Sequence, residues 1–259
     1  MRRASHLVGL GRNTLRYRPR PDKDVELRKR MKELAEERRR FGCPRLHVLL
    51  KREGLVVNRK RTERIYREER LSLRIRRRKK MASHGRVEIK ESERVNELWA
   101  MDFLQDALFD GRRVRVLAII DTFTRECLRI EVDTSIRGAR VVTALGQVAS
   151  MRGLPENIIV DNGPEFISNV LDAWSYERGV KLHFIRPGKP VDNAFIESFN
   201  GKFRDECLNQ NWFMSLGHAR QVIEAWRVDY NMVRPHSSLE DMTPNEFRLA
   251  SENELIYSS

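Results

Sequence analysis

Short apolar runs alternate with amphipathic stretches between residues 93 and 192, and their order predicts a mixed α/β domain. Apolar runs bounded by Asp, Gly, Asn or Pro are typical of strands, whereas apolar residues repeating every three or four positions indicate helices. The Asp110-Gly111 pair predicts a tight hairpin between the first two strands. The predicted elements are strands over 97–104, 114–120, 128–132, 157–160 and 180–185, and helices over 137–152 and 166–178.

Residues 23–70 have helical patterns only and predict three helices. The first runs to about Arg40, the second ends near Gly54, and the third begins after Asn58, a favourable N-cap residue. This arrangement is typical of a helix-turn-helix unit, whose last helix would enter a DNA groove. A solvated cationic helix face is the simpler alternative. The third helix carries the basic residues Arg59, Lys60, Arg61, Arg64 and Arg67.

Charge is distributed unevenly along the chain. The 259 residues carry a formal net charge of +13, but residues 1–92 contain 31 Lys and Arg against 12 Asp and Glu, whereas residues 93–259 contain 19 against 25. This asymmetry favours a nucleic-acid-binding module joined to a catalytic domain over a solubilising or membrane-surface segment. No apolar run reaches the roughly 18 residues of a membrane span. Three scattered cysteines predict buried free thiols in a reducing cytoplasm: Cys43, Cys127 and Cys207.

Three carboxylates are the candidate catalytic groups. Asp161 ends the strand over 157–160 and Asp102 is embedded in the first strand. Glu197 lies in a helix, with 35 residues between it and Asp161. An ionised Asp102 among the side chains of its own apolar run, Trp99 included, is costly unless a cation compensates it. Two Asp and one Glu suit a pair of hard divalent ions, which could clamp a phosphodiester, better than zinc. Taken singly, each Asp could equally be a turn or cap residue.

Several motifs resemble one known family. The motifs are Trp99-Ala-Met-Asp102-Phe, Asp161-Asn-Gly-Pro-Glu165-Phe, the segment from Asn193 to Leu208, Asp229-Tyr-Asn-Met-Val-Arg234-Pro-His236, and Arg39-Arg-Phe-Gly-Cys-Pro-Arg. They resemble the DDE-class transposases of bacterial insertion sequences. The resemblance implies a ribonuclease H-like, integrase-type mixed-sheet core preceded by a small all-α helix-turn-helix domain. The alternatives from the residues are a nuclease of the same fold and a DNA-binding regulator with a relic core.

The resemblance also implies a mechanism and partners. Asp102, Asp161 and Glu197 would bind two Mg²⁺ (or Mn²⁺) ions and catalyse strand cleavage and strand transfer on double-stranded DNA, at the element ends and the target. It implies a homo-oligomer in the bacterial cytoplasm, associated with the nucleoid. The chain would be the product of a second reading frame, fused to or assisted by the product of an upstream frame. Glu240 stands where a glycine is common in this family.

Further residues are expected around the three carboxylates. Arg204 lies two helical turns after Glu197, so it could hold a phosphate beside the metal site, and ordinary charge pairing on a surface helix is the alternative. Lys189 and Lys202 are further candidates for contact with the DNA backbone. Supporting roles around the metal are expected for Asn162, Glu165 and Asn193, although Glu165 is also a rival for the catalytic role. His236 is expected to be structural.

The sequence suggests five segments. Towards the C-terminus we expect a helix with Trp226 and Tyr230, and a short helix after Pro244, packed on the core. The proposed boundaries are 1–22 for a basic tail, 23–73 for the helix-turn-helix domain, 74–92 for a basic linker, 93–210 for the catalytic core and 211–259 for a helical extension.

Overall fold

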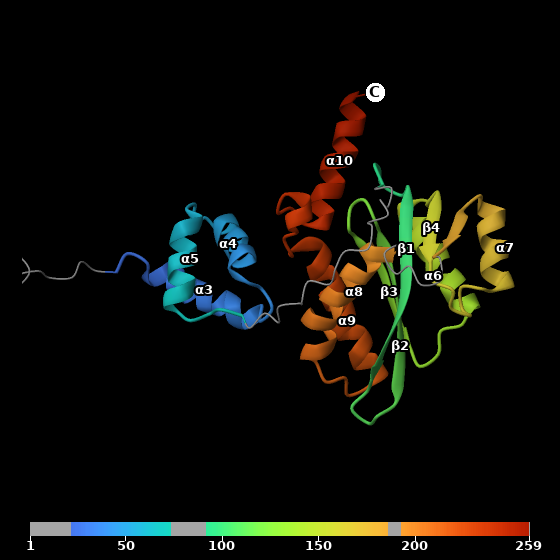
Figure 1. Cartoon of the computed structure of the whole chain (residues 1–259), viewed down its shortest axis with the longest axis horizontal. Helices are drawn as coiled ribbons and strands as arrows, with labels where there is room; N and C mark the ends of the chain where they lie inside the picture. Colours follow the sequence, from blue (N-terminus) through green and yellow to red (C-terminus); the bar gives the residue numbers. More distant parts are fainter. Residues whose placement is uncertain (1–21, 74–91, 186–192, 259) are drawn as a thin grey trace, which may run out of the picture. The chain divides into compact units, whose positions relative to one another are not determined.

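The computed structural model describes residues 22–73, 92–185 and 193–258 (Figure 1). The chain separates into two compact units, with the division between Ser72 and Leu73, and each unit is described by itself. The predictions for a basic tail, for a basic linker and for Lys189 concern residues outside the described ranges. Within the described ranges, no helix has the length and apolar character needed to span a bilayer.

The N-terminal unit consists of three helices, as predicted: α3 (Val25–Glu37), α4 (Cys43–Arg52) and α5 (Arg59–Glu68). The three helices pack around a shared apolar core. Its buried side chains include Leu27 of α3, Leu46 of α4 and Ile65 of α5. α3 ends at Glu37 instead of about Arg40, because Phe41 turns inward and is 5% exposed.

The helix ends of this unit follow local chemistry. The Asn58 side chain accepts a hydrogen bond from the backbone N–H of Lys60 at 2.9 Å, so the predicted N-cap is confirmed. Gly54 follows α4 with φ +75°, a conformation that costs a residue with a Cβ about 1–2 kcal/mol.

The second unit is built on a five-stranded mixed sheet with the order β3-β2-β1-β4-β5. β1 pairs antiparallel with β2, and β2 with β3, whereas β1–β4 and β4–β5 are parallel. Gly111 makes the predicted hairpin turn with φ +84°. All five predicted strands are confirmed as β1 (Leu98–Ala107), β2 (Arg113–Asp121), β3 (Cys127–Asp133), β4 (Asn157–Val160) and β5 (Lys181–Phe184).

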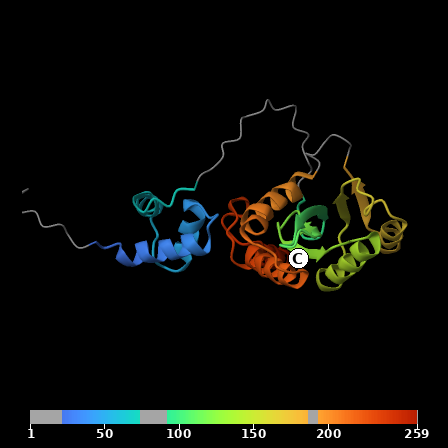
Figure 2. The ribbon, with the colours of Figure 1, turned by 90° about the horizontal axis from the view of Figure 1, so that it is seen from below.

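Helices cover both faces of this sheet (Figures 1 and 2). α6 (Gly138–Arg152) and α7 (Asn169–Arg178) cover one face, where Trp99 and Met101 of β1 are buried. α7 begins at Asn169, later than predicted, because Phe166 is fully buried and the Ser168 side chain caps the helix at Leu171 N.

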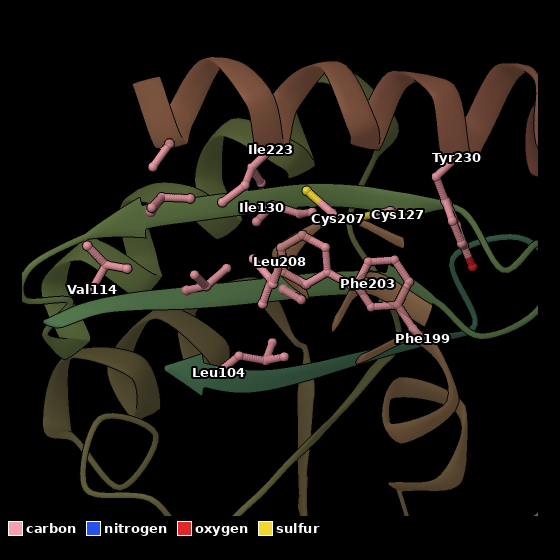
Figure 3. Packing of buried hydrophobic residues seen from close by; sticks show 14 of the residues in the cluster. Leu104, Val114, Cys127, Ile130, Phe199, Phe203, Cys207, Leu208, Ile223 and Tyr230 are labelled. Carbon is pink, nitrogen blue, oxygen red and sulfur yellow. The ribbon is translucent and has the colours of Figure 1, made fainter. Parts of the chain in front are cut away.

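The opposite face is covered by α8 (Ala194–Glu206) and α9 (Leu216–Met232). Figure 3 shows Phe199 and Phe203 of α8, with Ile223 of α9, packed over Leu104 and Ile130 of the sheet. Alternation along β1 therefore assigns even-numbered positions to the α8 side and odd-numbered positions to the α6 side.

The C-terminal segment is tied to α8 by a buried ion pair. Arg234, 2% exposed, donates two hydrogen bonds of 2.7 Å to the Glu206 carboxylate. His236 packs edge-on against Tyr230 at 4.8 Å between ring centroids and is 3% exposed, which confirms its structural role. Helix α10 (Pro244–Ser258) has 15 residues and is longer than the short helix predicted, because no Gly or Pro interrupts it.

Candidate active site

Asp102 extends from β1 towards α8. Its Oδ2 accepts a 2.6 Å hydrogen bond from Nδ2 of Asn200, and its Oδ1 accepts one of 2.8 Å from the backbone N–H of Phe103. The expectation that Asp102 lies among the side chains of its run holds for Leu104 but is wrong for Trp99. Because successive strand residues face opposite sides, Trp99 is buried on the α6 side, whereas Asp102 shares the α8 side with Ala100 and Leu104.

Asp161 follows β4 immediately, and the register brings it beside Asp102. β4 runs parallel to β1 with Ala100 opposite Ile159, so two further residues along each strand lead to the two aspartates. Oδ1 of Asp161 accepts a hydrogen bond from Gly163 N at 2.9 Å. A Cβ on Gly163 would stand 2.9 Å from that oxygen, so any larger residue at this position would displace the Asp161 carboxylate.

Glu197 lies on the exposed surface of α8, one helical turn before Asn200, which reaches Asp102. The pKa of Asp102 is raised to about 6, mainly by burial and also by the negative charges of Asp161 and Glu197, which outweigh the lowering effect of its hydrogen bonds. The three predicted carboxylates therefore interact electrostatically, although they come from a strand, a strand end and a helix.

The donor set suits a hard divalent cation. Carboxylate oxygens are its preferred ligands, and the side-chain oxygens of Asn193 and Asn200 are buried without a hydrogen-bond partner, so they are available as additional acceptors. Among the residues that the structure describes, however, no three His, Cys, Asp or Glu side chains are already gathered closely enough to hold one ion. A cation there would relieve the repulsion that Asp102 experiences.

The predicted supporting residues have defined contacts. Asn162 donates from Nδ2 to the carbonyl of Ile185 at 2.8 Å. Glu165 forms an ion pair with Arg115. Partial burial by itself would raise the pKa of Glu165, but the hydrogen bond and the charge of Arg115 hold this pKa below its usual value. Asn193 is 5% exposed and precedes α8.

Two residues that contact this region were not singled out from the sequence. Asn200 lies three residues after Glu197, and that helical spacing would have placed it near the site. No pattern near Arg115 in the sequence indicates its contact with the site, because its partner Glu165 is 50 positions away in the chain.

The predicted DNA-contact residues differ in their surroundings. On α5, three of the five basic residues make ion pairs: Arg61 and Arg64 with Asp24, and Arg59 with Glu63. Lys60 and Arg67 are exposed on the same helix. On α8, Arg204 is exposed and Lys202 is half-buried. The three cysteines carry no disulfide, and Cys43 is only half-buried, whereas Cys127 and Cys207 are buried as predicted.

Three family models match the chain. Two that are described as integrase core domain match residues 92–190 and 178–244, and one described as HTH-like domain matches residues 22–79. An uncharacterized 31.7 kDa protein of insertion element IS407 from Burkholderia multivorans is 51% identical, over 95% of this chain and 89% of its own length. A protein named as a transposase for insertion sequence element IS150, from Escherichia coli strain K12, is 26% identical over 88% of this chain and 84% of its own length.

A solved structure shares the fold. A chain of the simian T-cell lymphotropic virus intasome in complex with the PP2A regulatory subunit B56 gamma aligns with a TM-score of 0.53 at 16% identity, over 84% of this chain and 74% of that chain. Together with the five-stranded mixed sheet and the helical first unit, these similarities confirm the predicted ribonuclease H-like, integrase-type core preceded by a small all-α helix-turn-helix domain.

Proposed function

The chain belongs to the family of insertion-sequence transposases with an integrase core domain, and on this basis we propose that Asp102, Asp161 and Glu197 form its active site. A transposase is a polynucleotidyl transferase that acts on DNA, and dependence on divalent metal ions is typical of enzymes with an integrase core. The observation that carries the assignment is geometric: β4 pairs with β1 so that Asp161 follows beside Asp102, and Asn200, one helical turn after Glu197 on α8, donates a hydrogen bond to Asp102.

We propose two Mg²⁺ (or Mn²⁺) ions as the cofactor of this site. When bound, such a pair activates the attacking oxygen and stabilises the leaving oxygen of a phosphodiester. Asp102 and Asp161 would hold the ions from the sheet, and Glu197 would complete the site from α8. Asn200 keeps the Asp102 carboxylate oriented towards α8 through its hydrogen bond. The exposed Glu197 side chain has room to adjust as ions enter.

Both reaction steps suit a single site of this kind. In strand cleavage, water attacks the phosphodiester at an element end, leaving a 5′-phosphate and releasing a 3′-hydroxyl. In strand transfer, that 3′-hydroxyl attacks a second phosphodiester and displaces the 3′-oxygen of the attacked strand. Each step is an in-line phosphoryl transfer, which depends on positioning and on stabilisation of negative charge more than on covalent chemistry by the protein.

For the DNA partner we propose the double-stranded element ends and the target. Residues 23–73 would bind DNA through Lys60 and Arg67, joined by Arg59, Arg61 and Arg64 when their ion pairs open. In the core over 93–210, the candidates are Lys189, Lys202 and Arg204, and residues 211–259 would support this core. The same proposal includes a homo-oligomer that holds two element ends and a cytoplasmic location near the nucleoid. It also includes assistance from the product of an upstream reading frame.

The decisive experiment replaces Asp161 with Asn in the full chain. Strand cleavage of a labelled duplex with element ends should fall to background in Mg²⁺, because the neutral amide cannot supply the charge that binds the ion. DNA binding, measured by gel shift, should persist, because the N-terminal unit is untouched.

Asp172→Asn is the matched control. Asp172 lies in the first turn of α7 and is exposed, so its replacement removes the same charge from the core surface without touching the site. Cleavage by Asp161→Asn at the control's rate would remove Asp161 from the active site.

A further inference from the structure

The proposed metal ligands Asp102 and Asp161 lie on two neighbouring strands, and one side chain contacts both segments from the opposite face of the sheet. That side chain is Arg115 of β2. We propose that Arg115 is a positioning residue that sets the spacing of Asp102 and Asp161 for metal binding, an inference that rests on the proposed active site. It acts through Phe103 and Glu165.

Arg115 reaches the turn after β4 through Glu165. Nη1 of Arg115 donates to Oε1 of Glu165, and the two side chains are only 28% and 15% exposed. An ion pair sheltered to this degree constrains its partners more than a fully exposed pair does, and removal of one partner leaves a half-buried charge uncompensated. The turn that carries Asp161 is therefore held against β2.

The same guanidinium group lies over the residue that follows Asp102. Its Cζ is 4.5 Å from the centroid of the Phe103 ring, a cation–π distance. Phe103 packs in turn against Phe166, with 5.0 Å between ring centroids, and Phe166 is fully buried. One side chain thus joins β1 next to Asp102 with the turn that begins at Asp161.

The turn transmits a movement of Glu165 to Asp161 because little space separates them. The backbone N–H groups of Phe166 and Ile167 both donate to the carbonyl of Gly163 at 3.0 Å, which closes the turn. A Cβ built on Gly163 would lie 2.9 Å from Oδ1 of Asp161 and 3.5 Å from Oε2 of Glu165. The two carboxylates therefore lie on either side of one glycine.

The function of this connection follows from the charges. Asp102 and Asp161 repel each other when both are ionised, because the pairing of β1 with β4 brings them side by side. Without a tie across β2, the turn would relax away from β1 and the two carboxylates would separate. A residue that orients metal ligands through their neighbours typically contributes about 10- to 100-fold to metal affinity.

The test measures Mn²⁺ binding to the full chain without DNA, by electron paramagnetic resonance of free Mn²⁺. We expect Arg115→Gln to raise the Mn²⁺ Kd about tenfold, because Gln neither compensates Glu165 nor stacks on Phe103 as a cation. Arg115→Lys should recover part of the affinity, since it keeps the charge. The half-saturating Mg²⁺ concentration for strand cleavage should rise in parallel, with DNA binding unchanged.

Arg112→Gln is the matched control. Arg112 also pairs with a carboxylate, Asp110 at 2.7 Å, but in the exposed hairpin turn between β1 and β2. It should leave Mn²⁺ binding at the wild-type level. If Arg115→Gln leaves the Mn²⁺ Kd unchanged as well, Arg115 is a structural ion-pair residue and the inference is overturned.

Two further variants keep the outcome clear. Asp161→Asn tests the proposed function: if it does not weaken Mn²⁺ binding, the active site itself is misassigned, whereas a loss in Asp161→Asn alone refutes only the role of Arg115. If Arg115→Gln does not fold, Glu165→Gln removes the same ion pair from the other side. A folded Glu165→Gln protein with wild-type Mn²⁺ affinity would equally overturn the inference.

Discussion

Asp102 is the residue at which folding and the proposed chemistry have opposing requirements. Its carboxylate is half-buried beside Asp161 and Glu197, and the pKa of about 6 records how unfavourable its charged form is. Asn200 compensates in part through one hydrogen bond at 2.6 Å. A group that is unfavourable in the empty site but binds a cation well is the electrostatic signature of a metal ligand.

The first prediction concerns pH and stability. The pKa of Asp102 is about 6 in the folded protein, but about 4 in the unfolded chain. Between these values the native state binds more protons, so this residue makes stability fall as pH rises from about 4 to 6. In EDTA, Asp102→Asn should therefore be more stable than wild type by roughly 1–3 kcal/mol at pH 7.5 and nearly equal at pH 4.

Urea unfolding of both proteins at the two pH values measures this difference. The orphaned side-chain oxygen of Asn200 favours the substitution as well, because the amide introduced at position 102 could donate to it. A stability difference that does not change between pH 4 and pH 7.5 would show that the Asp102 charge is not the cause. In Mg²⁺, the same variant should lose strand cleavage.

At the scale of elements, α8 combines two faces with different tasks. Ile196, Phe199 and Phe203 are buried against the sheet, which fixes the helix in place. Glu197 and Asn200 occupy another face, so the packing of the first set determines where the second set can reach. The buried Arg234–Glu206 pair then ties the end of α8 to the chain after α9.

The turn before α10 contains a residue in an unfavourable backbone conformation. The 3₁₀ helix η3 (Ser237–Leu239) ends at Glu240, whose φ of +54° and ψ of +40° are left-handed. Glu240→Gly should stabilise the protein by roughly 0.5–1 kcal/mol, since glycine lacks the Cβ that makes this conformation unfavourable. The midpoint of urea unfolding measures the gain.

Glu240→Ala serves as its control. Alanine keeps the Cβ and removes only the exposed carboxylate, so it should bring no comparable gain. Equal stabilisation by Ala and Gly would mean that the charge of Glu240, not its backbone conformation, is unfavourable.

At the scale of the whole molecule, charge separates the DNA-binding part from the catalytic part, and internal pairing moderates it. Residues 1–92 carry a net charge of +19, whereas residues 93–259 carry −6. Within the described N-terminal unit, Asp24 is 6% exposed and pairs with both Arg61 and Arg64. Its hydrogen bond to Arg64 lowers the pKa of Asp24, with Arg61 contributing against the effect of burial. Two arginines of α5 are thereby paired inside the unit, although their side chains remain 40% and 50% exposed.

The corresponding prediction is a change in how DNA binding depends on salt. Asp24→Asn should release Arg61 and Arg64 for phosphate contacts, so that non-specific affinity rises at low salt. The slope of log K against log salt should steepen by roughly 0.9 for each new contact. Gel shifts across a salt series measure the slope, and circular dichroism checks that the three helices persist. An unchanged slope in a folded variant would show that both arginines already contact DNA in the wild type.

The sequence by itself determined most of the elements and singled out the three candidate carboxylates. Period-two and period-3.6 patterns give all five strands, the three N-terminal helices and the helix of Glu197, because local burial patterns require no knowledge of distant partners. The spacing between Asp161 and Glu197, together with the quoted motifs, identified the family. Helix ends were less predictable: α3 and α7 are shorter than expected and α10 is longer, since tertiary burial of Phe41 and Phe166 decides where a helix stops or starts.

Only the tertiary structure decided which side chains meet. Asn200 on Asp102, Arg115 on Glu165, and Asp24 on Arg61 and Arg64 join residues between 37 and 98 positions apart. Sequence spacing reports neighbours along one helix or strand, but these pairs depend on the order of the strands and on how the helices pack. Trp99 lies on the opposite face from Asp102 because successive strand residues alternate, which needs no tertiary information. The pairing of β1 with β4 decides that Asp161 lies beside Asp102.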